Sequence, residues 1–595
     1  MNQGKNAEHL KPREWKLKAE VPEADLSPLL SSLSLSPITL KVCVSRGLTS
    51  PEAIQNFLLP KLEMLTKPEL IKDMDLALRR LEQVRASQEP VRIFGDYDVD
   101  GTTGAALLSW VFRDFGLTHD VRQPDRFKDG YGLNVGAIED AAANGIKLVV
   151  TVDCGITSFE AAERAKVLGV DLIIIDHHQL DQIKGMPPAL AVLNPQRPDC
   201  PSGLKQLCGC GLAFYLAMGL RTYGRERQWF APGKEPNLKQ HLDLVVMATA
   251  ADMVPLTGDN HILVRHGLEV LKHTKKPGVR ALLVAAKIGD RELSPSHLGF
   301  VIGPRINASG RMQSASLALE LLTTLDSHRA TELANQLEKL NKERAELQNQ
   351  IWDQVRVRVE KGIAEGKFKY GIVVADAEWH EGVVGIVASR VTETFRKPAA
   401  VIALREDFGK GSVRSYAGKD VLQALRMSGQ HLLGFGGHKH AAGLSVALDQ
   451  VEVFAEAFDQ ALSELQEDLD ARPLLIEGVC AVEDLDVRTL IELEKLGPFG
   501  PGNPEPVFQC RASVQDYRVL KERHLKLNLS SVGSEVPHHL EAIWFNGAER
   551  ADIQSFMNDE FPEDLEWAGV PELNRFRGNV TPTFRIRDWR KPRNH

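Results

Sequence analysis

Short apolar runs alternate with amphipathic stretches in the part of the chain that follows residue 90. The runs VRIF, LVVTV and LIII have the length and the β-branched content of buried strands. The stretches between them carry apolar residues at helical spacing and end at glycine. The pattern predicts strands at 91–94, 148–152 and 172–175 and helices at 105–116, 134–145 and 158–169. Such alternation is typical of an α/β domain with a parallel sheet and helices on both faces.

A longer amphipathic pattern runs from about 315 to 361. Its apolar stripe, which Arg344 interrupts, consists of Leu333, Leu337, Leu340, Leu347 and Ile351. The pattern favours a connecting helix over a dimerising coiled coil, which requires more heptads. At about 1.5 Å per residue, such a helix would separate two domains by ~50–70 Å.

The remaining third of the chain predicts two further domains. Apolar runs at 370–376, 399–404 and 410–415 indicate a second α/β domain that extends to about residue 470. After the Pro/Gly-rich segment LGPFGPGNPEP, alternating strands such as FQCRASVQDYRVL, LKLNLS and FRIRDW follow. Short alternating strands of this kind are typical of a small antiparallel barrel or sandwich.

Composition and length agree with a multidomain globular protein. A chain of 595 residues exceeds the roughly 250 residues that one core supports. Its 43% apolar and 26% charged residues are ordinary proportions for a soluble protein. No apolar run reaches the roughly 18 residues that cross a bilayer, and the first twenty residues lack the apolar core of a signal peptide. We therefore expect a cytoplasmic protein.

Charge and cysteine content leave the partner open. The net charge of −8 does not by itself indicate a nucleic-acid-binding protein, but acidic clusters can hide a local basic groove. Among the seven cysteines, Cys200, Cys208 and Cys210 lie close together and suggest zinc. Because a second paired cluster is missing, free thiols in a reducing cytoplasm are favoured.

Acidic and imidazole side chains follow the predicted strands. They are Asp96, Asp98, Asp100, Asp153, Asp176, His177, His178 and Asp252, the last at the end of the run LVVMATAAD, also taken as a strand. Ligands of open α/β sheets bind at the carboxyl ends of the strands, so these groups are expected along one edge. Alternate residues of an extended segment point the same way, which would bring the three aspartates at 96–100 together.

Such a concentration of carboxylates predicts a metal centre. Crowded carboxylates repel one another unless cations offset their charge. A mixture of carboxylate and imidazole suits Mn²⁺, with Mg²⁺ as a possible substitute. Two ions ~3.5–4 Å apart that share a carboxylate favour in-line displacement at phosphorus. Each motif alone also fits a calcium-binding turn or capping histidines, but their conjunction favours phosphoester hydrolysis.

The motifs DYDVDGTTG (96–104), TVDCG (151–155), DHH (176–178) and ATAADMVPL (248–256) resemble, in this order, the metal-site motifs of the DHH phosphoesterase superfamily. The resemblance implies that Asp98 and Asp100 each bind one metal and that Asp153 bridges the two. His177 and Asp252 would complete the shell of the second metal, and His178 would face the substrate phosphate. Asp96 stands where small phosphatases of the superfamily have a His-containing motif, so the ligands of the first metal stay open.

Further motifs narrow the resemblance. GGHKHAAG (436–443) and WHEGVVGIVASR (379–390) resemble the DHHA1 domain, which partners the DHH domain across a cleft. With GPRINASGRM (303–312) and LGPFGPGNPEP (496–506) they are similar, over about residues 45 to 545, to the RecJ family of bacterial exonucleases. A zincin motif HExxH is excluded, because Val384 occupies the position of its second histidine.

The resemblance implies an α/β fold in which a long helix joins a parallel-sheet DHH domain to a second α/β DHHA1 domain, with a β-barrel OB-fold after them. The parts would be an N-terminal helical lead-in at 1–75, the DHH domain at 76–315, the connecting helix at 316–362, the DHHA1 domain at 363–470, and the OB-fold with the C-terminal tail at 471–595. In the OB-fold, side chains available for base stacking and phosphate contacts are Phe508, Tyr517, Lys521, Arg523, His524 and Lys526.

The implied activity is 5′→3′ hydrolysis of single-stranded DNA with two Mn²⁺ ions, releasing 5′ mononucleotides, in DNA repair and recombination. The strand would thread between the DHH and DHHA1 domains. The expected substrate-binding residues are Arg126, Tyr131, Arg305, Asn307, Arg311, Ser412, Arg414 and His438, with 303–312 taken as a polar loop. Single-strand-binding protein and a RecQ-type helicase are implied partners of a monomeric enzyme that binds no membrane.

Two alternatives remain at this point. The chain could be another DHH-family phosphodiesterase, which acts on oligoribonucleotides or cyclic dinucleotides. It could also be a non-catalytic DNA-binding scaffold of the same fold, although such scaffolds have lost the metal ligands that are all present here.

Overall fold

The computed structural model describes residues 14–18, 21–125, 130, 132–289, 291–466, 473–533, 536–558, 561–576 and 578–592. The chain forms two compact units. The larger consists of Thr66–Val254 and His266–Asp470, and the smaller of Met1–Leu65, Pro255–Arg265 and Ala471–His595. Among the described helices, none has both the length and the apolar character needed to cross a membrane.

A five-stranded parallel sheet forms the first part of the larger unit. Its strands are β2 (Val91–Gly95), β3 (His119–Arg122), β4 (Leu148–Val152), β5 (Asp171–Ile175) and β6 (Ala191–Leu193), in the order β3-β2-β4-β5-β6. Every neighbouring pair is parallel. The predicted parallel sheet is thus confirmed, and its strands all end at one edge.

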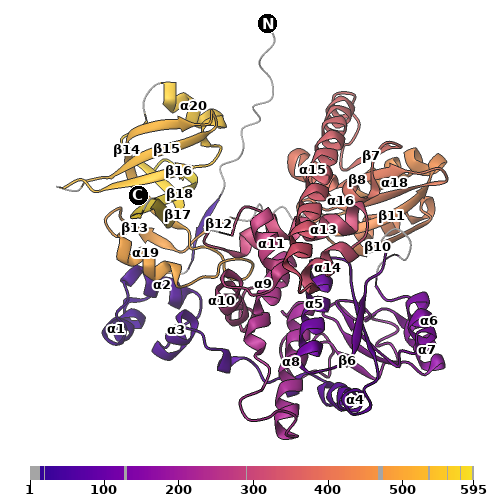
Figure 1. Cartoon of the computed structure of the whole chain (residues 1–595). Coiled ribbons are helices and arrows are strands. Elements are labelled where there is room, and N and C mark those ends of the chain that lie inside the picture. The colour runs from indigo at the N-terminus through magenta and orange to yellow at the C-terminus, as the bar shows by residue number, and fades with distance from the viewer. Residues whose placement is uncertain are drawn as a thin grey trace. The chain divides into compact units, whose positions relative to one another are not determined.

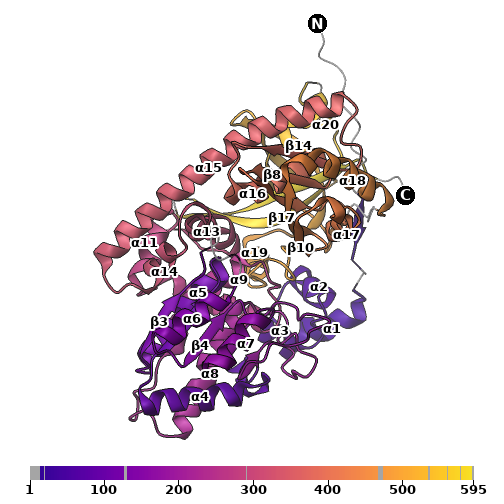
Figure 2. The ribbon, with the colours of Figure 1, turned by 90° about the vertical axis from the view of Figure 1, so that its right-hand side faces the viewer.

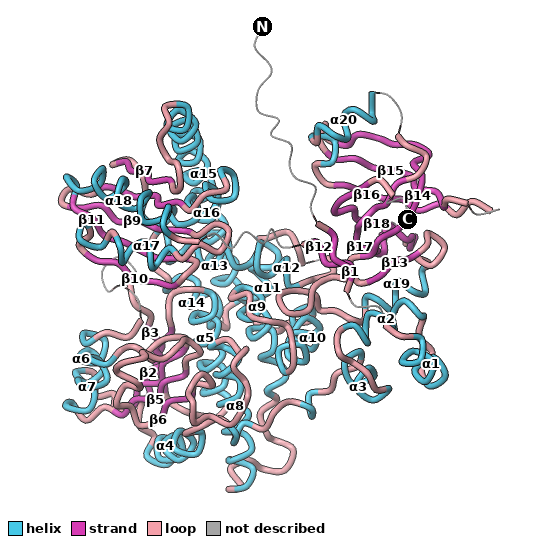
Figure 3. The backbone as a smooth tube through the Cα atoms, turned by 180° about the vertical axis from the view of Figure 1, so that it is seen from behind, coloured by secondary structure: helices cyan, strands magenta, loops and turns pink. Residues whose placement is uncertain are grey.

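Helices cover both faces of this sheet. Those of this region are α4 (Met74–Ser87), α5 (Val99–Asp114), α6 (Val135–Ala143), α7 (Phe159–Leu168), α8 (Gly209–Glu226), α9 (Leu242–Ala251), α11 (Pro277–Ala285), α12 (Pro295–His297), α13 (Gly303–Met312) and α14 (Ser316–Thr323). Helix α10 (Asp259–Lys272) belongs to the smaller unit as far as Arg265 and to the larger unit after it. Helices α6 and α7 lie on one face, and α5 and α8 lie on the other (Figures 1 and 3).

Two segments of this region differ from the sequence-based expectation. The run that ends at Asp252 forms helix α9 and not a strand. A short apolar run fits a buried helix as well as a buried strand, and its alanines and methionine favour the helix. The segment 303–312, expected as a polar loop, forms helix α13, with Pro304 in the first turn, where proline is tolerated.

The long connecting helix is shorter at its start than predicted. Helix α14 ends at Thr323, and a new helix, α15 (Ser327–Ala364), begins after Asp326, whose side chain accepts hydrogen bonds from the first amides of α15. Its 38 residues span roughly 57 Å. In Figure 2 its length is in view, and it packs first on α11, α13 and α14 and then on the second α/β domain.

That second domain is built on a mixed sheet in the order β10-β11-β9-β8-β7. The strands are β7 (Ile372–Asp376), β8 (Ala399–Leu404), β9 (Phe408–Arg414), β10 (Gly434–His438) and β11 (Ala441–Ala447), and the helices are α16 (Glu381–Phe395), α17 (Val421–Met427) and α18 (Val451–Glu464). Only the pair of β7 and β8 is parallel. The glycine-rich strand β10 lies at the edge of the sheet.

The smaller unit contains a closed five-stranded barrel (Figure 3). The C-terminal part of this unit consists of β12 (Leu474–Ile476), β13 (Gly478–Cys480), α19 (Val487–Glu494), β14 (Phe508–Leu520), β15 (His524–Ser531), β16 (His539–Trp544), α20 (Ala551–Asn558), β17 (Leu565–Phe576) and β18 (Asn579–Arg590). The ring runs β14-β15-β16-β18-β17 and closes by pairing of β17 with β14. This confirms the predicted barrel.

The N-terminal segment belongs to the same unit as the barrel. It contributes β1 (Trp15–Leu17), α1 (Glu23–Ser32), α2 (Pro37–Ser45) and α3 (Pro51–Leu58). Apolar side chains of the three helices share one core with the barrel. Strand β1 pairs in parallel with β12. The buried carboxylate of Glu477 joins the two segments, because it accepts hydrogen bonds from Lys18 Nζ at 2.9 Å, Arg46 Nη2 at 2.9 Å and Ser45 Oγ at 2.8 Å.

Candidate active site

The three aspartates of the first motif lie on a strand-to-helix turn and not on the extended segment that the pattern suggested. Asp98 is the N-cap of α5, and its Oδ1 accepts a hydrogen bond from Gly101 N at 3.0 Å. Asp100 already lies in the first helical turn. Glycine is required at position 101, since a Cβ there would lie 2.5 Å from the backbone of Asp96. The tight turn, and not strand alternation, therefore gathers these carboxylates.

Carboxylates and imidazoles from distant segments meet beside this turn in three overlapping groups. The groups are Asp96 with Asp98 and Asp153; Asp100 with His177 and Asp252; and Asp153 with His177 and His178. Within each group the ligand atoms lie within 4.8 Å of one another. Asp153 and His177 are each shared by two groups, so the groups form one continuous cluster of potential metal ligands.

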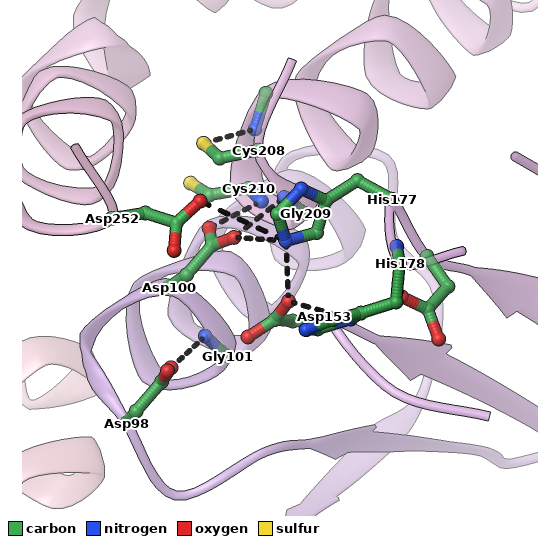
Figure 4. A network of polar contacts seen from close by, with 12 residues as sticks. Asp98, Asp100, Gly101, Asp153, His177, His178, Cys208, Gly209, Cys210 and Asp252 are labelled. Atoms are coloured by element: carbon green, nitrogen blue, oxygen red, sulfur yellow. Dashed lines mark hydrogen bonds and ion pairs between the residues drawn. The ribbon is translucent and has the colours of Figure 1, made fainter. Parts of the chain in front are cut away.

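His177 lies at the centre of this cluster (Figure 4). Its Nε2 is 3.2 Å from Asp153 Oδ1, 3.7 Å from Asp100 Oδ2 and 3.7 Å from Asp252 Oδ2. These three carboxylates come from α5, from the end of β4 and from the end of α9. The fold thus brings together all the residues that the sequence predicted as metal ligands.

Asp100 is held by the start of helix α8. Its two carboxylate oxygens accept hydrogen bonds from Gly209 N at 2.6 Å and Cys210 N at 2.8 Å. A Cβ at Gly209 would lie 2.7 Å from Asp153 Cβ, so only glycine allows the helix to approach this closely. The sequence analysis missed these two amides; the glycines on both sides of Cys210 were the available signal.

Asp153 has a constrained backbone and a perturbed carboxyl group. Its φ of 64° lies in the left-handed region, which costs of order 1 kcal/mol for a residue with a Cβ. Burial raises the pKa of its side chain well above the usual value, and the neighbouring charges of Asp100 and Asp98 raise it further. A strained residue with a destabilised charge is typical of a functional site.

Two further carboxyl groups of the cluster, those of Asp100 and Asp252, have raised pKa values. Burial raises the pKa of Asp100, and burial with the charges of Asp100 and Asp98 raises the pKa of Asp252 to about 8. In the described part of the chain, neither Asp100 nor Asp252 forms an ion pair with a Lys or Arg side chain. Divalent cations fit this donor set, because they supply the missing positive charge.

Asp176, the first residue of the DHH triplet, orients the third. Its Oδ1 accepts hydrogen bonds from His178 N at 3.0 Å and His178 Nδ1 at 2.8 Å, and its Oδ2 accepts one from Ile156 N at 3.0 Å. Burial alone would lower the pKa of His178, but the hydrogen bond and the negative charge of Asp176 raise it to about 9. Asp176 thus favours the protonated form of this half-exposed imidazole, which can donate to a phosphate oxygen.

A cavity of about 1130 Å³ adjoins the metal cluster within the larger unit. Tyr97, Asp98 and Arg311 line it from the first domain. From the second domain, the predicted residues Ser412, Arg414 and His438 all line it. Arg414 Nη1 donates a hydrogen bond to Ser412 Oγ at 2.7 Å. The cavity thus connects one metal-cluster residue with hydroxyl, guanidinium and imidazole groups.

Four other residues that were predicted to bind substrate are not among the described residues that line this cavity. Arg305 and Asn307 lie on α13 and are not among the residues that line the cavity. Arg305 Nε instead bonds Glu338 Oε2 at 2.7 Å. Arg126 and Tyr131 lie outside the described residues.

Sequence analysis also missed Lys410 and Glu381, which line the cavity. Lys410, Ser412 and Arg414 alternate along β9, so period-two spacing was a usable signal for Lys410.

The cysteines are not part of the metal cluster. All seven are free thiols, and none belongs to a group of potential metal ligands in the described part of the chain. Cys208 Sγ instead accepts a hydrogen bond from Gly211 N as the N-cap of α8. The free-thiol interpretation is therefore favoured by the structure.

Three family models match separate parts of the chain. The DHH family, N-terminal domain, matches residues 90–249, the DHHA1 domain matches 367–464, and the RecJ OB domain matches 476–588. The fold and the site therefore define a DHH-family protein that combines these three domains.

Relatives over the whole length specify the family. Proteins named single-stranded-DNA-specific exonuclease RecJ from Dickeya dadantii and Salmonella typhimurium are 35% and 34% identical. The matches cover 92% and 97% of this chain and 94% and 98% of those relatives. The chain belongs to the RecJ family. A relative of the same name from Bacillus subtilis is 34% identical over 90% of this chain, which spans 66% of that longer protein.

A solved structure agrees with this membership. The crystal structure of RecJ in complex with Mn²⁺ from Thermus thermophilus has a TM-score of 0.80 and 29% identity. The match covers 98% of this chain and 80% of that chain.

Proposed function

We propose that the protein is a metal-dependent exonuclease that degrades single-stranded DNA from the 5′ end and releases 5′ mononucleotides. Family membership supports the class of reaction and substrate. The observation that carries the proposal is that Asp98 belongs both to the metal cluster and to the wall of the cavity that Ser412 and Arg414 line. A phosphate held in this cavity would lie next to the cluster.

The metal ligands in this proposal are Asp96, Asp98, Asp100, Asp153, His177 and Asp252, with Mn²⁺ as the cation and Mg²⁺ as a substitute. Bound there as a pair, such ions would acidify a bound water and would neutralise charge that develops on phosphate oxygens. Asp153 and His177 join the ligand groups. His178, fixed and kept protonated by Asp176, donates to a phosphate oxygen.

The second domain positions the strand. Arg414 and Ser412 present hydrogen-bond donors from one face of β9, and the pKa of His438 is lowered by burial and by the charges of His440 and Arg414. Arginine forms bidentate contacts with phosphate. These groups hold the 5′ phosphate and fix its distance from the cluster without base-specific contacts, which leaves cleavage independent of sequence.

The function is tested with the purified chain, Mn²⁺ and four substrates: 5′-phosphorylated single-stranded DNA, the same sequence as a blunt duplex, a ribodinucleotide and pyrophosphate. We expect rapid release of mononucleotides from single-stranded DNA and little from the duplex. Equal or faster turnover of the dinucleotide or pyrophosphate would assign the chain to another DHH phosphodiesterase. DNA binding without any hydrolysis would make it a scaffold.

The 5′-end pocket has its own test. Arg414→Ala should reduce the preference for a 5′-phosphorylated over a 5′-hydroxyl strand by about tenfold, the usual range for one charge-assisted contact. Ser389→Ala on α16, whose hydroxyl bonds its own helix backbone, serves as the control. An unchanged preference removes Arg414 from the pocket.

We also propose that the enzyme acts as a cytoplasmic monomer in DNA repair and recombination, together with single-strand-binding protein and a RecQ-type helicase. The five-part domain division given above is part of the same proposal. Co-sedimentation of the purified chain with each partner, and the sedimentation coefficient of the chain alone, test these assignments.

A further inference from the structure

A second cavity, of about 680 Å³, lies on the barrel of the smaller unit where β14 separates from β17. Strand β14 pairs with β17 only as far as Ala512, whereas its pairing with β15 continues to Leu520. From Ser513 onward, one edge of β14 is therefore not paired with any other described strand. Exposed strand edges of this kind can accept an added strand from another chain.

Apolar and aromatic side chains form part of the lining of this cavity. Tyr517 comes from β14, Val532 follows β15, and Phe556 and Met557 come from α20. The rings of Tyr517 and Phe556 lie 5.5 and 5.7 Å from that of Phe561. Tyr517 Oη donates to Met557 O at 2.9 Å, which fixes the ring. Aromatic residues and methionine are enriched at the centres of protein interfaces.

The charged residues that line this cavity are acidic. They are Asp516, Glu563 and Asp564, and no described lining residue is Lys or Arg. Asp564 is compensated by Arg511, whose Nε lies 2.7 Å from its Oδ1. Asp516 and Glu563 form no ion pair with a described Lys or Arg, so the rim carries net negative charge. A phosphodiester backbone is repelled by such a rim, whereas a cationic segment is attracted.

We propose that this cavity, the acidic barrel pocket, binds an extended peptide segment of a partner protein. The segment carries a large apolar side chain, which packs against the exposed faces of Tyr517, Phe556 and Phe561. It also carries an adjacent Lys or Arg, which pairs with Glu563 or Asp516. Its backbone adds to the open edge of β14. The proposal concerns a surface outside the larger unit and does not depend on the nuclease function.

The experiment is selection of phage-displayed random peptides on the immobilised full-length protein, followed by affinity measurements with the synthetic winners. We expect the recovered peptides to combine an aromatic or large aliphatic residue with adjacent Lys or Arg. Glu563→Lys should weaken them by about tenfold or more, the size expected when one rim pair becomes repulsive. Glu483→Lys, the same charge reversal on an exposed residue outside the pocket, should change affinity by less than about twofold.

A second variant distinguishes a peptide from nucleic acid. Val532, at the rim, is 40% exposed, so Val532→Ser leaves the barrel core intact. This variant should weaken the peptides about three- to tenfold and leave the affinity for a labelled oligo(dT) strand unchanged. Three outcomes overturn the proposal: no peptide is recovered above background, the recovered peptides are acidic, or they bind the Glu563→Lys variant as tightly as the wild type. A tenfold loss of oligo(dT) binding in Val532→Ser also overturns it and assigns the pocket to DNA.

Discussion

Glu477 and Asp153 are both buried carboxylates, yet the groups that surround them differ in sign. Two protein cations, Lys18 and Arg46, face Glu477. Burial alone would raise the pKa of Glu477, but the charge of Arg46 and the hydrogen bond from Lys18 lower it. Burial raises the pKa of Asp153, and its carboxylate neighbours raise it further.

The comparison separates a structural use of buried charge from a chemical one. At Glu477 the chain supplies its own counter-charge, and the product is a stable joint between β1, α2 and the barrel. At Asp153 the chain assembles carboxylates around imidazoles and leaves the excess negative charge for an external cation to offset. Crowded carboxylates of this kind lower the stability of the metal-free protein, and metal binding restores that stability.

The largest expected effect is on catalysis. Asp153→Asn should lower hydrolysis of single-stranded DNA by about 10³-fold or more, because the carboxylate shared between the ligand groups is lost. Single-turnover assays with Mn²⁺ measure this effect, and binding of the same strand should change by less than about threefold. Residual hydrolysis above a tenth of the wild-type rate would contradict the central position of Asp153.

Metal binding should stabilise one site and not the other. Mn²⁺ at 100 times its dissociation constant should stabilise the wild-type larger unit by about 2.7 kcal/mol for each ion bound. The gain should be absent in Asp153→Asn and intact in Glu477→Gln. Thermal unfolding with and without Mn²⁺ measures the difference, and equal gains in both variants would show that the metal binds elsewhere.

Removing the compensated charge should lower stability instead. Glu477→Gln should reduce the free energy of unfolding of the smaller unit by about 2 kcal/mol, because it leaves Arg46, which is mostly buried, without its partner. Urea unfolding measures this change, with Glu483→Gln as the exposed control, expected within about 0.5 kcal/mol. If Glu477→Gln loses as little free energy of unfolding as the control, solvent must hydrate the charged groups of Lys18 and Arg46 in the variant.

The two sites should also respond to pH in opposite directions. Asp252, with a pKa of about 8 in place of 3.8, keeps a proton in the folded, metal-free protein that the unfolded chain loses. The contribution of Asp252 to the free energy of unfolding therefore falls as pH rises towards 8. Glu477 has a folded pKa below its ordinary 4.5, so its contribution is present above that value and is lost as pH falls through the lowered pKa.

Unfolding experiments without metal test this prediction. Between about pH 6 and pH 8.5 the larger unit should lose on the order of 1 kcal/mol, less in Asp252→Asn. Between about pH 5 and pH 3.5 the smaller unit should lose a similar amount, less in Glu477→Gln. A wild-type slope that either variant leaves unchanged would assign the pH dependence to other groups.

Much of this arrangement was predictable from local patterns. Runs such as LVVTV predicted the strands of the parallel sheet, and motif order predicted the family and the carboxylates and imidazoles that lie together. The errors share a cause: Asp252 and Arg311 were placed on a strand and a loop because short segments carry little information about helix or strand. The glycines at 209 and 211 indicate a close approach of the backbone, but the partner of the Gly209 and Cys210 amides, Asp100, depends on how α5 and α8 pack and could not be predicted.

The strand-to-helix turn that gathers Asp96, Asp98 and Asp100 has one further consequence. Every ligand of the metal cluster belongs to residues 96–252, whereas Ser412, Arg414 and His438 are joined to that region through α15. The positions of the metal ligands relative to one another are thus set within the first domain alone. A displacement of the second sheet would change the width of the cavity and leave the arrangement of the metal ligands unchanged.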